Sequence, residues 1–212
     1  MFVALIDYGS GNLRSAEKAL ARAASDAGTK QEIIVTSDAV VVAGAERIVL
    51  PGVGAFGDCI NSLSALPGMV ETLNDKVRKQ GVPFLGICVG MQLLATVGRE
   101  FGDHKGLGWI DGEVVKITPN DPALKIPHMG WNELKLEREH PVLAGMNGVN
   151  VYFVHSYCIK PASRSDILAV TDYGGEIVSA VARDNIVGVQ FHPEKSQAKG
   201  LSLLANFLSW KP

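Results

Sequence analysis

The sequence predicts an α/β protein with a doubly wound, mostly parallel sheet and additional antiparallel strands. In the first half, four short apolar runs alternate with segments of helical periodicity, which is the pattern of βα units. In the second half, β-type segments follow one another with few helical stretches between them, which indicates antiparallel strands. The 212 residues are 47% hydrophobic and 20% charged. No linker-like or low-complexity segment divides them, so we expect one domain over residues 1–212.

The first βα unit lies at the N-terminus. Phe2–Ile6 is a short apolar run that predicts a buried strand, and Asp7–Asn12 then turns the chain. Asn12 or Ser10 could cap the helix that follows, and Gly28 could end it. The apolar residues of this helix recur at helical spacing and are Leu13, Ala16, Leu20 and Ala23.

The second and third strands are predicted at Ile33–Val35 and Arg47–Leu50, and the third leads into a glycine-rich loop, residues 51–57. This loop lacks the lysine and hydroxyl residues that end a P-loop, and it lacks the G-x-G-x-x-G pattern that opens a dinucleotide-binding helix. Nucleotide binding is therefore a weak interpretation. Backbone N–H groups that closely approach a ligand or reaction intermediate are a better one.

A second helix is expected from Asp58 to Gly81, with Val70, Leu73 and Val77 on one face. The fourth strand begins after Pro83. In doubly wound sheets ligands bind at the carboxyl ends of the strands. The glycine-rich loop and the residues that follow the fourth strand should therefore face one crevice.

The second half contains β-type segments at Glu113–Ile117, Trp131–Leu136, Val151–Ile159, Ile167–Thr171, Ile177–Ala182 and Ile186–Gln190. We interpret them as antiparallel additions to the parallel sheet. The chain then forms an amphipathic helix whose apolar face contains Leu201, Leu204, Ala205 and Leu208.

Composition argues against several classes of function. Lysine and arginine total 20 against 22 acidic residues, a formal charge of −2. The chain therefore has no excess of positive charge that would favour binding to nucleic acid or to an anionic membrane. The N-terminus shows no basic leader, and no apolar run reaches the about 18 residues that span a bilayer. Cys59, Cys88 and Cys158 are too few and scattered for a disulfide framework or a zinc site. We expect a cytoplasmic protein without metal or cofactor, and without a nucleic-acid or membrane partner.

Cys88 stands between two glycines within Phe84–Leu94. The spacing Gly86-x-Cys88-x-Gly90 is that of a nucleophile elbow, with sulfur in place of a serine hydroxyl. Glycines leave room for the tight turn between strand and helix. At the start of the helix, free N–H groups and the helix dipole favour the thiolate, which is the nucleophile. The alternative is a buried core cysteine.

His192 is the best placed of the five histidines to act as a base. It follows a strand and precedes Pro193 and Glu194. Proline favours extended geometry in the residue before it, and residues two apart on an extended chain project to the same side. Glu194 could accept a hydrogen bond from one imidazole nitrogen and leave the other for the thiol proton, although a strand-terminating turn is the alternative. We expect the other histidines in solvated loops (His104, His140) or as hydrogen-bonded structural residues (His128, His155).

Gly86-x-Cys88-x-Gly90-x-Gln92 together with His192-Pro193-Glu194 resembles the class I, or triad, glutamine amidotransferases, and the resemblance spans essentially the whole chain. It implies a flavodoxin-like fold and a catalytic triad of Cys88, His192 and Glu194. Further similarity to the glutaminases that serve imidazole glycerol phosphate synthesis, in histidine biosynthesis, lies in residues 6–13, 51–56, 127–132 and 153–157.

The resemblance implies that Cys88 attacks the side-chain carboxamide of L-glutamine, that His192 protonates the departing ammonia, and that water then hydrolyses the thioester to glutamate. Both steps pass through an oxyanion, which needs preorganised donors. The implied donors are the Val89 N–H group and the Val53–Gly54 peptide. The implied glutamine contacts are Gly54, Gln92 and the backbone of Ser156 and Tyr157.

The resemblance also implies a partner. In this family, ammonia passes to a (β/α)₈-barrel cyclase subunit that makes imidazole glycerol phosphate and aminoimidazole carboxamide ribotide. Such a barrel takes about 250 residues, so it must be another polypeptide, and we expect a heterodimer. The implied interface residues are Asn12, Trp131, Tyr157 and Lys195, although the two aromatics could instead be core residues and the lysine a solvated charge.

Two other functions remain open from the sequence. One is a class I glutaminase of another pathway, such as anthranilate, aminodeoxychorismate or pyridoxal phosphate synthesis. The other is a non-catalytic interaction protein with a vestigial triad. Cys59 and Cys158 are expected to act only as small hydrophobic residues.

Overall fold

The computed structural model describes residues 2–29 and 31–212. An eight-stranded sheet at its centre has the strand order β2-β1-β3-β4-β14-β13-β12-β9. The first five strands in this order pair in parallel, and the last three are antiparallel to their neighbours. The predicted α/β fold with a mostly parallel sheet is therefore confirmed.

The βα units of the first half form as predicted. The parallel strands are β1 (Phe2–Ile6), β2 (Glu32–Thr36), β3 (Arg47–Leu50) and β4 (Phe84–Ile87). Every residue of β3 and β4 is buried, as expected for strands covered on both faces. Helix α1 (Leu13–Asp26) buries Ala16, Leu20 and Ala23 against the sheet, while the Asn12 side chain makes no capping hydrogen bond.

The segment between β3 and β4 differs from the single helix that periodicity predicts. Helix α3 (Phe56–Ala65) begins two residues before Asp58, and α4 (Met69–Leu73) continues into a π-helical turn, Asn74–Lys79. The two helices are separate because Leu66 precedes Pro67 and is extended, with φ −72° and ψ 121°. Sequence analysis also missed helix α2 (Ala39–Ala43), which is too short to give a periodic signal.

The second half corrects the expectation that all its strands are antiparallel additions to the main sheet. Strand β14 (Ile186–Val189) pairs in parallel with β4. The antiparallel additions are β13 (Glu176–Arg183), β12 (Ile167–Asp172) and β9 (Lys135–Leu136). β14 takes a central place because it is buried along its whole length, as a parallel strand requires.

The other strands form two small sheets beside the main one. β8 (His128–Glu133) pairs with β10 (Asn150–His155), and the second sheet contains β11 (Tyr157–Pro161), β7 (Gly112–Lys116), β5 (Val97–Gly98) and β6 (His104–Lys105). The continuous strand expected at Val151–Ile159 is thus divided at Ser156, so that its two parts join different sheets.

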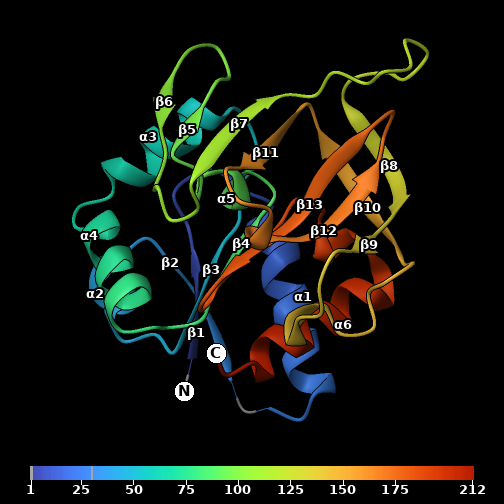
Figure 1. The fold of residues 1–212 in the computed structure, drawn as a ribbon. Coiled ribbons are helices and arrows are strands. Elements are labelled where there is room, and N and C mark those ends of the chain that lie inside the picture. The colour runs from blue at the N-terminus through green and yellow to red at the C-terminus, as the bar shows by residue number, and fades with distance from the viewer. Residues whose placement is uncertain (1, 30) are drawn as a thin grey trace.

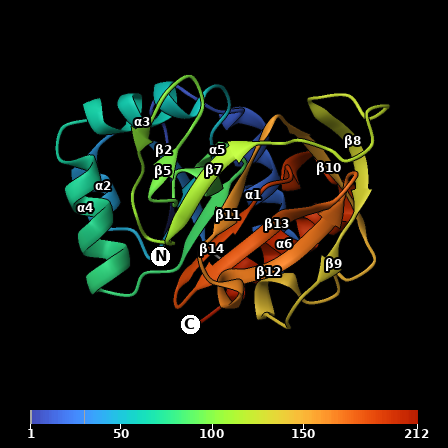
Figure 2. The same ribbon diagram turned by 45° about the horizontal axis from the view of Figure 1, so that its top comes forward.

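Helices cover the sheet from two sides. Helix α6 (Gln197–Ser209) lies beside α1, while α2, α3 and α4 gather on the opposite side of the molecule (Figures 1 and 2). Leu204 and Leu208 of α6 are buried as predicted, whereas Leu201 and Ala205 are only partly buried. Within residues 2–29 and 31–212, we find no helix with the length and apolar character needed to span a membrane.

Candidate active site

Two neighbouring strands bring the predicted triad together. β4 and β14 pair in parallel, with Gly86 opposite Gly188 and Ile87 opposite Val189. Because the strands end at the same edge of the sheet, Cys88 and the segment 190–194 emerge next to each other. The Cys88 N–H group donates to the Val189 carbonyl oxygen at 2.8 Å, which fixes this register.

Cys88 lies on a strained turn between β4 and helix α5 (Val89–Gln92). Its backbone has φ 55° and ψ −114°, which is rare for a residue with a side chain. A Cβ atom on Gly90 would lie 1.9 Å from the Leu50 carbonyl oxygen, and one on Gly86 would lie 2.6 Å from the Gly90 carbonyl oxygen. Both glycines are therefore required by close backbone approach, as the elbow interpretation predicts.

His192 and Glu194 form a buried pair. His192 Nδ1 lies 2.8 Å from Glu194 Oε1, and the two side chains are only 3% and 4% exposed. His192 is extended, as predicted from the proline, but Glu194 lies in the 3₁₀ turn Pro193–Lys195 and not on the extended chain that the sequence indicated. This arrangement orients the imidazole ring.

The free ring nitrogen of His192 is available for proton transfer. Nε2 makes no well-formed hydrogen bond to any residue that the structure describes, but it is close enough to Cys88 for the thiol to affect its titration. Burial lowers the pKa of His192, yet hydrogen bonds and charge interactions with Cys88 and Glu194 outweigh this and raise that pKa to about 9. His192 therefore holds a proton strongly once it has taken one.

Cys88 and His192 line a cleft of about 350 Å³, a volume suited to a small metabolite. Its walls come from the glycine-rich loop, the elbow, and the junction between β10 and β11. The lining includes the predicted glutamine contacts and oxyanion residues, which are Val53, Gly54, Val89, Gln92, Ser156 and Tyr157. The structure thus brings these residues to one cavity, while their roles remain predictions.

The predicted oxyanion donors are close together, but one of them is occupied. The Val89 N–H group donates to the Gly52 carbonyl oxygen at 3.3 Å. The Val53 carbonyl oxygen accepts hydrogen bonds from Ser10 Oγ and, at 3.4 Å, from Cys59 Sγ. In this conformation residues outside the loop satisfy its Gly52 and Val53 carbonyl oxygens, and the Val89 N–H group is not free to bind an oxyanion.

The predicted interface residues lie near the cleft or on the surface beside it. Trp131 is 48% exposed, so it is not a core aromatic, and its ring meets the Tyr152 ring edge-on at 6.1 Å. Lys195 lines the cleft with Tyr157, and its ammonium lies 5.5 Å from the centre of the Tyr152 ring. Asn12 lines a small cavity beside His192 and Glu194. A partner contact at these residues remains a prediction.

Sequence reasoning missed two polar residues of the site. Gln190 is fully buried, and its Nε2 donates to Cys88 Sγ at 3.7 Å. Its position two residues before His192, on the chain that leaves β14, could have indicated a side chain on the same side. Glu100 lines the cleft and accepts a hydrogen bond from the Phe56 N–H group at 2.8 Å, a contact without a signal in the sequence.

The remaining histidines and cysteines differ from His192 and Cys88. His128 and His155 are hydrogen-bonded and buried, as expected, whereas His104 and His140 are partly buried rather than solvated. Burial lowers the pKa of His140 to about 4. Cys59 and Cys158 are free and buried, and burial raises the pKa of Cys158 to about 11. In residues 2–29 and 31–212 no group of three histidine, cysteine or acidic residues could hold a metal ion.

Comparisons with known proteins find relatives along the whole chain. The family model described as glutamine amidotransferase class-I matches residues 4–210. The protein named imidazole glycerol phosphate synthase subunit HisH from Brucella suis biovar 1 is 59% identical over 216 residues, covering 100% of each chain. The protein of the same name from Rhodospirillum rubrum is 59% identical over 214 residues, again with 100% coverage of each chain. A crystal structure of a glutamine amidotransferase matches with a TM-score of 0.73 at 18% identity, covering 98% of this chain and 97% of that one, which supports the fold.

Proposed function

Because the chain belongs to the class I glutamine amidotransferase family, we propose that it is the glutaminase subunit of an imidazole glycerol phosphate synthase, with L-glutamine as its substrate. Its full-length identity of 59% to subunits with that name supports this acceptor pathway over anthranilate, aminodeoxychorismate or pyridoxal phosphate synthesis. The observation that carries the enzymatic assignment is that Cys88 and His192 line one cleft and that His192 is paired with the buried Glu194. A vestigial triad would not need such a pair.

The proposed reaction uses the triad in two steps. The Cys88 sulfur attacks the carboxamide carbon of glutamine while His192 holds the thiol proton, and this proton is then delivered to the departing ammonia. Water then attacks the γ-glutamyl thioester, gives its proton to His192, and releases glutamate and the thiol. Glu194 holds the imidazole ring and stabilises its protonated form. Glutamine and water thus become glutamate and ammonia.

Both steps need donors for an oxyanion, and the Val89 N–H group is our first candidate. In the free chain this group is bonded to the Gly52 carbonyl oxygen. The Gly52 carbonyl must therefore turn away before Val89 can stabilise a tetrahedral intermediate. The second proposed donor lies in the Val53–Gly54 peptide, where Gly54 has φ +108° and accommodates such a rearrangement.

The relatives are named as subunits, so the chain has a partner polypeptide. We propose that this partner is a (β/α)₈-barrel cyclase, that the two form a heterodimer, and that Asn12, Trp131, Tyr157 and Lys195 lie at or near their interface. The exposed Trp131 ring supports this assignment because large exposed aromatics are typical of interfaces. A cytoplasmic location is proposed because a free catalytic thiol persists in a reducing compartment.

The first prediction concerns the nucleophile and the partner together. We expect low glutaminase activity in the isolated chain and strong stimulation by the cyclase with its nucleotide ligand, because the Val89 N–H group is occupied in the free chain. In the complex, Cys88→Ala should abolish glutamine-dependent synthesis and leave the cyclase reaction with added ammonium salt unchanged. Glutamate release and cyclase product, measured in parallel, check both expectations.

Two outcomes would contradict the proposal. Stimulation only by a chorismate-using partner would assign the chain to another pathway. No adduct on Cys88 after treatment of the complex with a glutamine-analogue electrophile, followed by mass spectrometry, would favour a non-catalytic protein. Cys158→Ala is a matched control because this buried thiol lies outside the cleft, and it should leave both activities intact.

A further inference from the structure

A chain of hydrogen bonds begins at the catalytic sulfur. Gln190 Nε2 donates to Cys88 Sγ, and Gln190 Oε1 accepts from Gln92 Nε2 at 2.9 Å. The same Gln92 nitrogen donates to the Tyr157 carbonyl oxygen at 3.0 Å. Because Gln92 Nε2 faces two acceptors, both of its hydrogens are used and the orientations of the two amides are fixed. The chain thus reaches the backbone of Tyr157 at the wall of the cleft.

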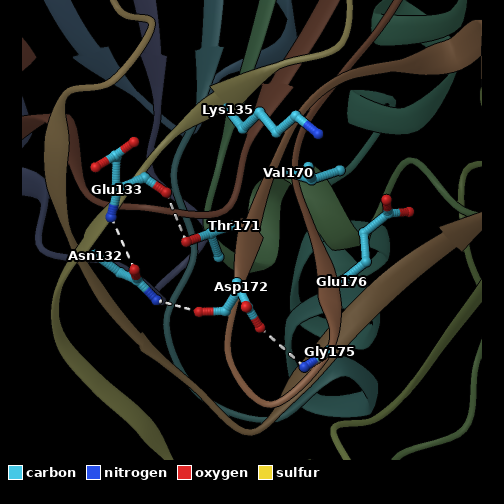
Figure 3. A pocket seen from close by; sticks show the side chains of 8 residues that line it. All are labelled: Asn132, Glu133, Lys135, Val170, Thr171, Asp172, Gly175 and Glu176. Carbon is cyan, nitrogen blue, oxygen red and sulfur yellow. Dashed lines mark hydrogen bonds between the residues drawn. The ribbon is translucent and has the colours of Figure 1, made fainter.

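Two buried histidines continue the chain away from the site. His155 Nδ1 lies 2.9 Å from the Tyr157 carbonyl oxygen, and His155 Nε2 lies 2.9 Å from His128 Nδ1. His128 Nε2 lies 3.3 Å from Asn132 Nδ2, which also donates to the Asp172 carbonyl oxygen at 2.8 Å. Figure 3 shows this outer end, where Asn132 reaches Asp172 in a surface hollow. His128 is only 2% exposed and His155 only 6%.

The hydrogen-bond partners of His155 and His128 allow only one arrangement of protons on the two rings. A carbonyl oxygen can only accept, so His155 carries its hydrogen on Nδ1, and its Nε2 must accept from His128 Nδ1–H. His128 Nε2 then accepts from Asn132, whose own oxygen is held by the Glu133 N–H group at 2.8 Å. This arrangement requires both histidines to be neutral. Burial lowers the pKa of each to about 4, which keeps them neutral at physiological pH.

From this arrangement we propose that His155 and His128 are positioning residues for glutamine: they hold the Tyr157 carbonyl, and with it the β10–β11 wall of the cleft, in the geometry that binds the substrate. The proposal rests on the glutaminase assignment. The donated bond from His155 Nδ1 fixes the carbonyl of Tyr157 directly, and His128 acts by enforcing the tautomer of His155. Neither residue exchanges a proton in the reaction.

The packing around His128 makes a shape-preserving test possible. Its ring is stacked between those of Phe153 and Tyr173, with centroid distances of 4.7 and 4.0 Å. His128→Phe should keep this stack and remove both hydrogen bonds of the imidazole. At position 155, His155→Asn retains an N–H group near the place of Nδ1, whereas His155→Leu retains a similar volume without a donor. The pair of substitutions separates the bond to Tyr157 from simple filling of space.

The test measures KM for glutamine and kcat, normalised by titration of Cys88, in the complete complex with the cyclase and its ligand. Loss of one positioning hydrogen bond should raise KM roughly fivefold to twentyfold in His155→Leu and His128→Phe, with kcat changed less than about twofold. His155→Asn should restore most of the affinity, with KM within about threefold of the unsubstituted chain. His140→Phe is the control, because it removes a partly buried histidine with a lowered pKa away from the cleft and should lower stability without changing KM.

An unchanged KM in both His155→Leu and His128→Phe would overturn the proposal and leave the two residues with a structural role only. Equal KM values for His155→Asn and His155→Leu would overturn it as well, because the donated bond would then be irrelevant.

A second measurement is independent of activity. Nitrogen-15 spectra of the full chain should show both histidines as neutral Nδ1–H tautomers, and His128→Phe should change the spectrum of His155. Protonated imidazoles or the Nε2–H tautomer in the unsubstituted chain would contradict the proposal. If the complex had no glutaminase activity but showed these tautomers, the functional assignment would fail while the hydrogen-bonded chain would stand.

Discussion

His155 and His192 are both almost fully buried beside the same cleft, yet their pKa values move in opposite directions. Burial lowers the pKa of His155 to about 4, because its hydrogen-bond partners include no carboxylate. Burial acts on His192 in the same sense, but Cys88 and Glu194 raise its pKa to about 9. Cys88 and Glu194 together therefore distinguish the raised pKa of His192 from the lowered pKa of His155.

The residue-scale prediction is that Glu194→Gln moves the alkaline limit of glutaminase activity to lower pH. His192 must be protonated to deliver a proton to ammonia, so activity in the complex should fall as the pH rises past about 9. Without the carboxylate the pKa of His192 falls, and the decline should begin at least about one pH unit earlier. The pH profile of kcat/KM in the complex measures this shift.

A matched change at a surface carboxylate provides the control. Glu176 pairs with exposed Arg164 away from the cleft, so Glu176→Gln should leave the profile where it is. An alkaline limb that stays in place in Glu194→Gln would show that the carboxylate does not set the pKa of His192.

At the scale of elements, periodicity and glycine spacing correctly predicted the strands, helix and turn that local interactions determine. The apolar runs of β1, β3 and β4, the helix α1, and the elbow at Cys88 form where periodicity and glycine spacing place them. What the sequence could not reveal depends on distant partners. An isolated apolar segment does not show whether it joins the main sheet, so the parallel pairing of β14 with β4 and the division of 150–161 between two small sheets could not be predicted.

The same limit applies to the site. Cys88, His192 and Glu194 were identifiable because each has a local sequence signature. The contact of Gln190 with Cys88 and the pairing of His128 with His155 have none, because each joins residues that are far apart in the chain.

The element-scale prediction concerns the elbow. Gly90→Ala should lower stability by about 3 kcal/mol and reduce activity, because the added methyl would lie 1.9 Å from the Leu50 carbonyl oxygen and push β3 from α5. For a chain of this size that loss corresponds to a decrease in Tm of roughly 6–12 °C. Thermal unfolding of the full chain measures it.

Gly81→Ala separates crowding from backbone conformation. Gly81 has φ +71° and nothing within 4 Å of its added Cβ, so only the strain of a left-handed residue remains, about 1 kcal/mol. Equal losses in the two variants would contradict the view that close approach, rather than backbone freedom, requires glycine at position 90.

At the scale of the whole molecule, one cleft combines the loop after β3, the elbow after β4, the β10–β11 junction and the turn after β14. The first of these segments is the glycine-rich loop, residues 51–57. That loop covers the Val89 N–H group and also lies near the proposed interface residue Asn12. A partner docked there could change the loop without disturbing the sheet, which is consistent with a glutaminase that works within a complex.

The buried histidines also make the stability of the fold depend on pH. In the unfolded chain a histidine has a pKa near 6.5. When folding lowers that pKa to about 4, the unfolded state binds the proton more tightly, so the protein loses stability as the pH falls from about 6.5 to 4. His128, His140 and His155 are of this kind, and a fully buried histidine can contribute on the order of 3 kcal/mol across that range. His192, with its raised pKa, adds stability that is present below about pH 6.5 and is lost as the pH rises towards 9.

The whole-molecule prediction is therefore a stability maximum between about pH 6 and 7, with different histidines responsible for the two flanks. Urea unfolding of the full chain from pH 4.5 to 9.5 should show a decrease on both sides. His140→Phe should flatten the acid flank alone, because it removes a histidine that resists protonation only in the folded state. His192→Gln should flatten the alkaline flank alone, because the interaction with Glu194 is lost. Stability that rises between pH 6.5 and 4.5 would mean that the buried pair of His128 and His155 accepts protons in the fold, which its hydrogen bonds do not permit.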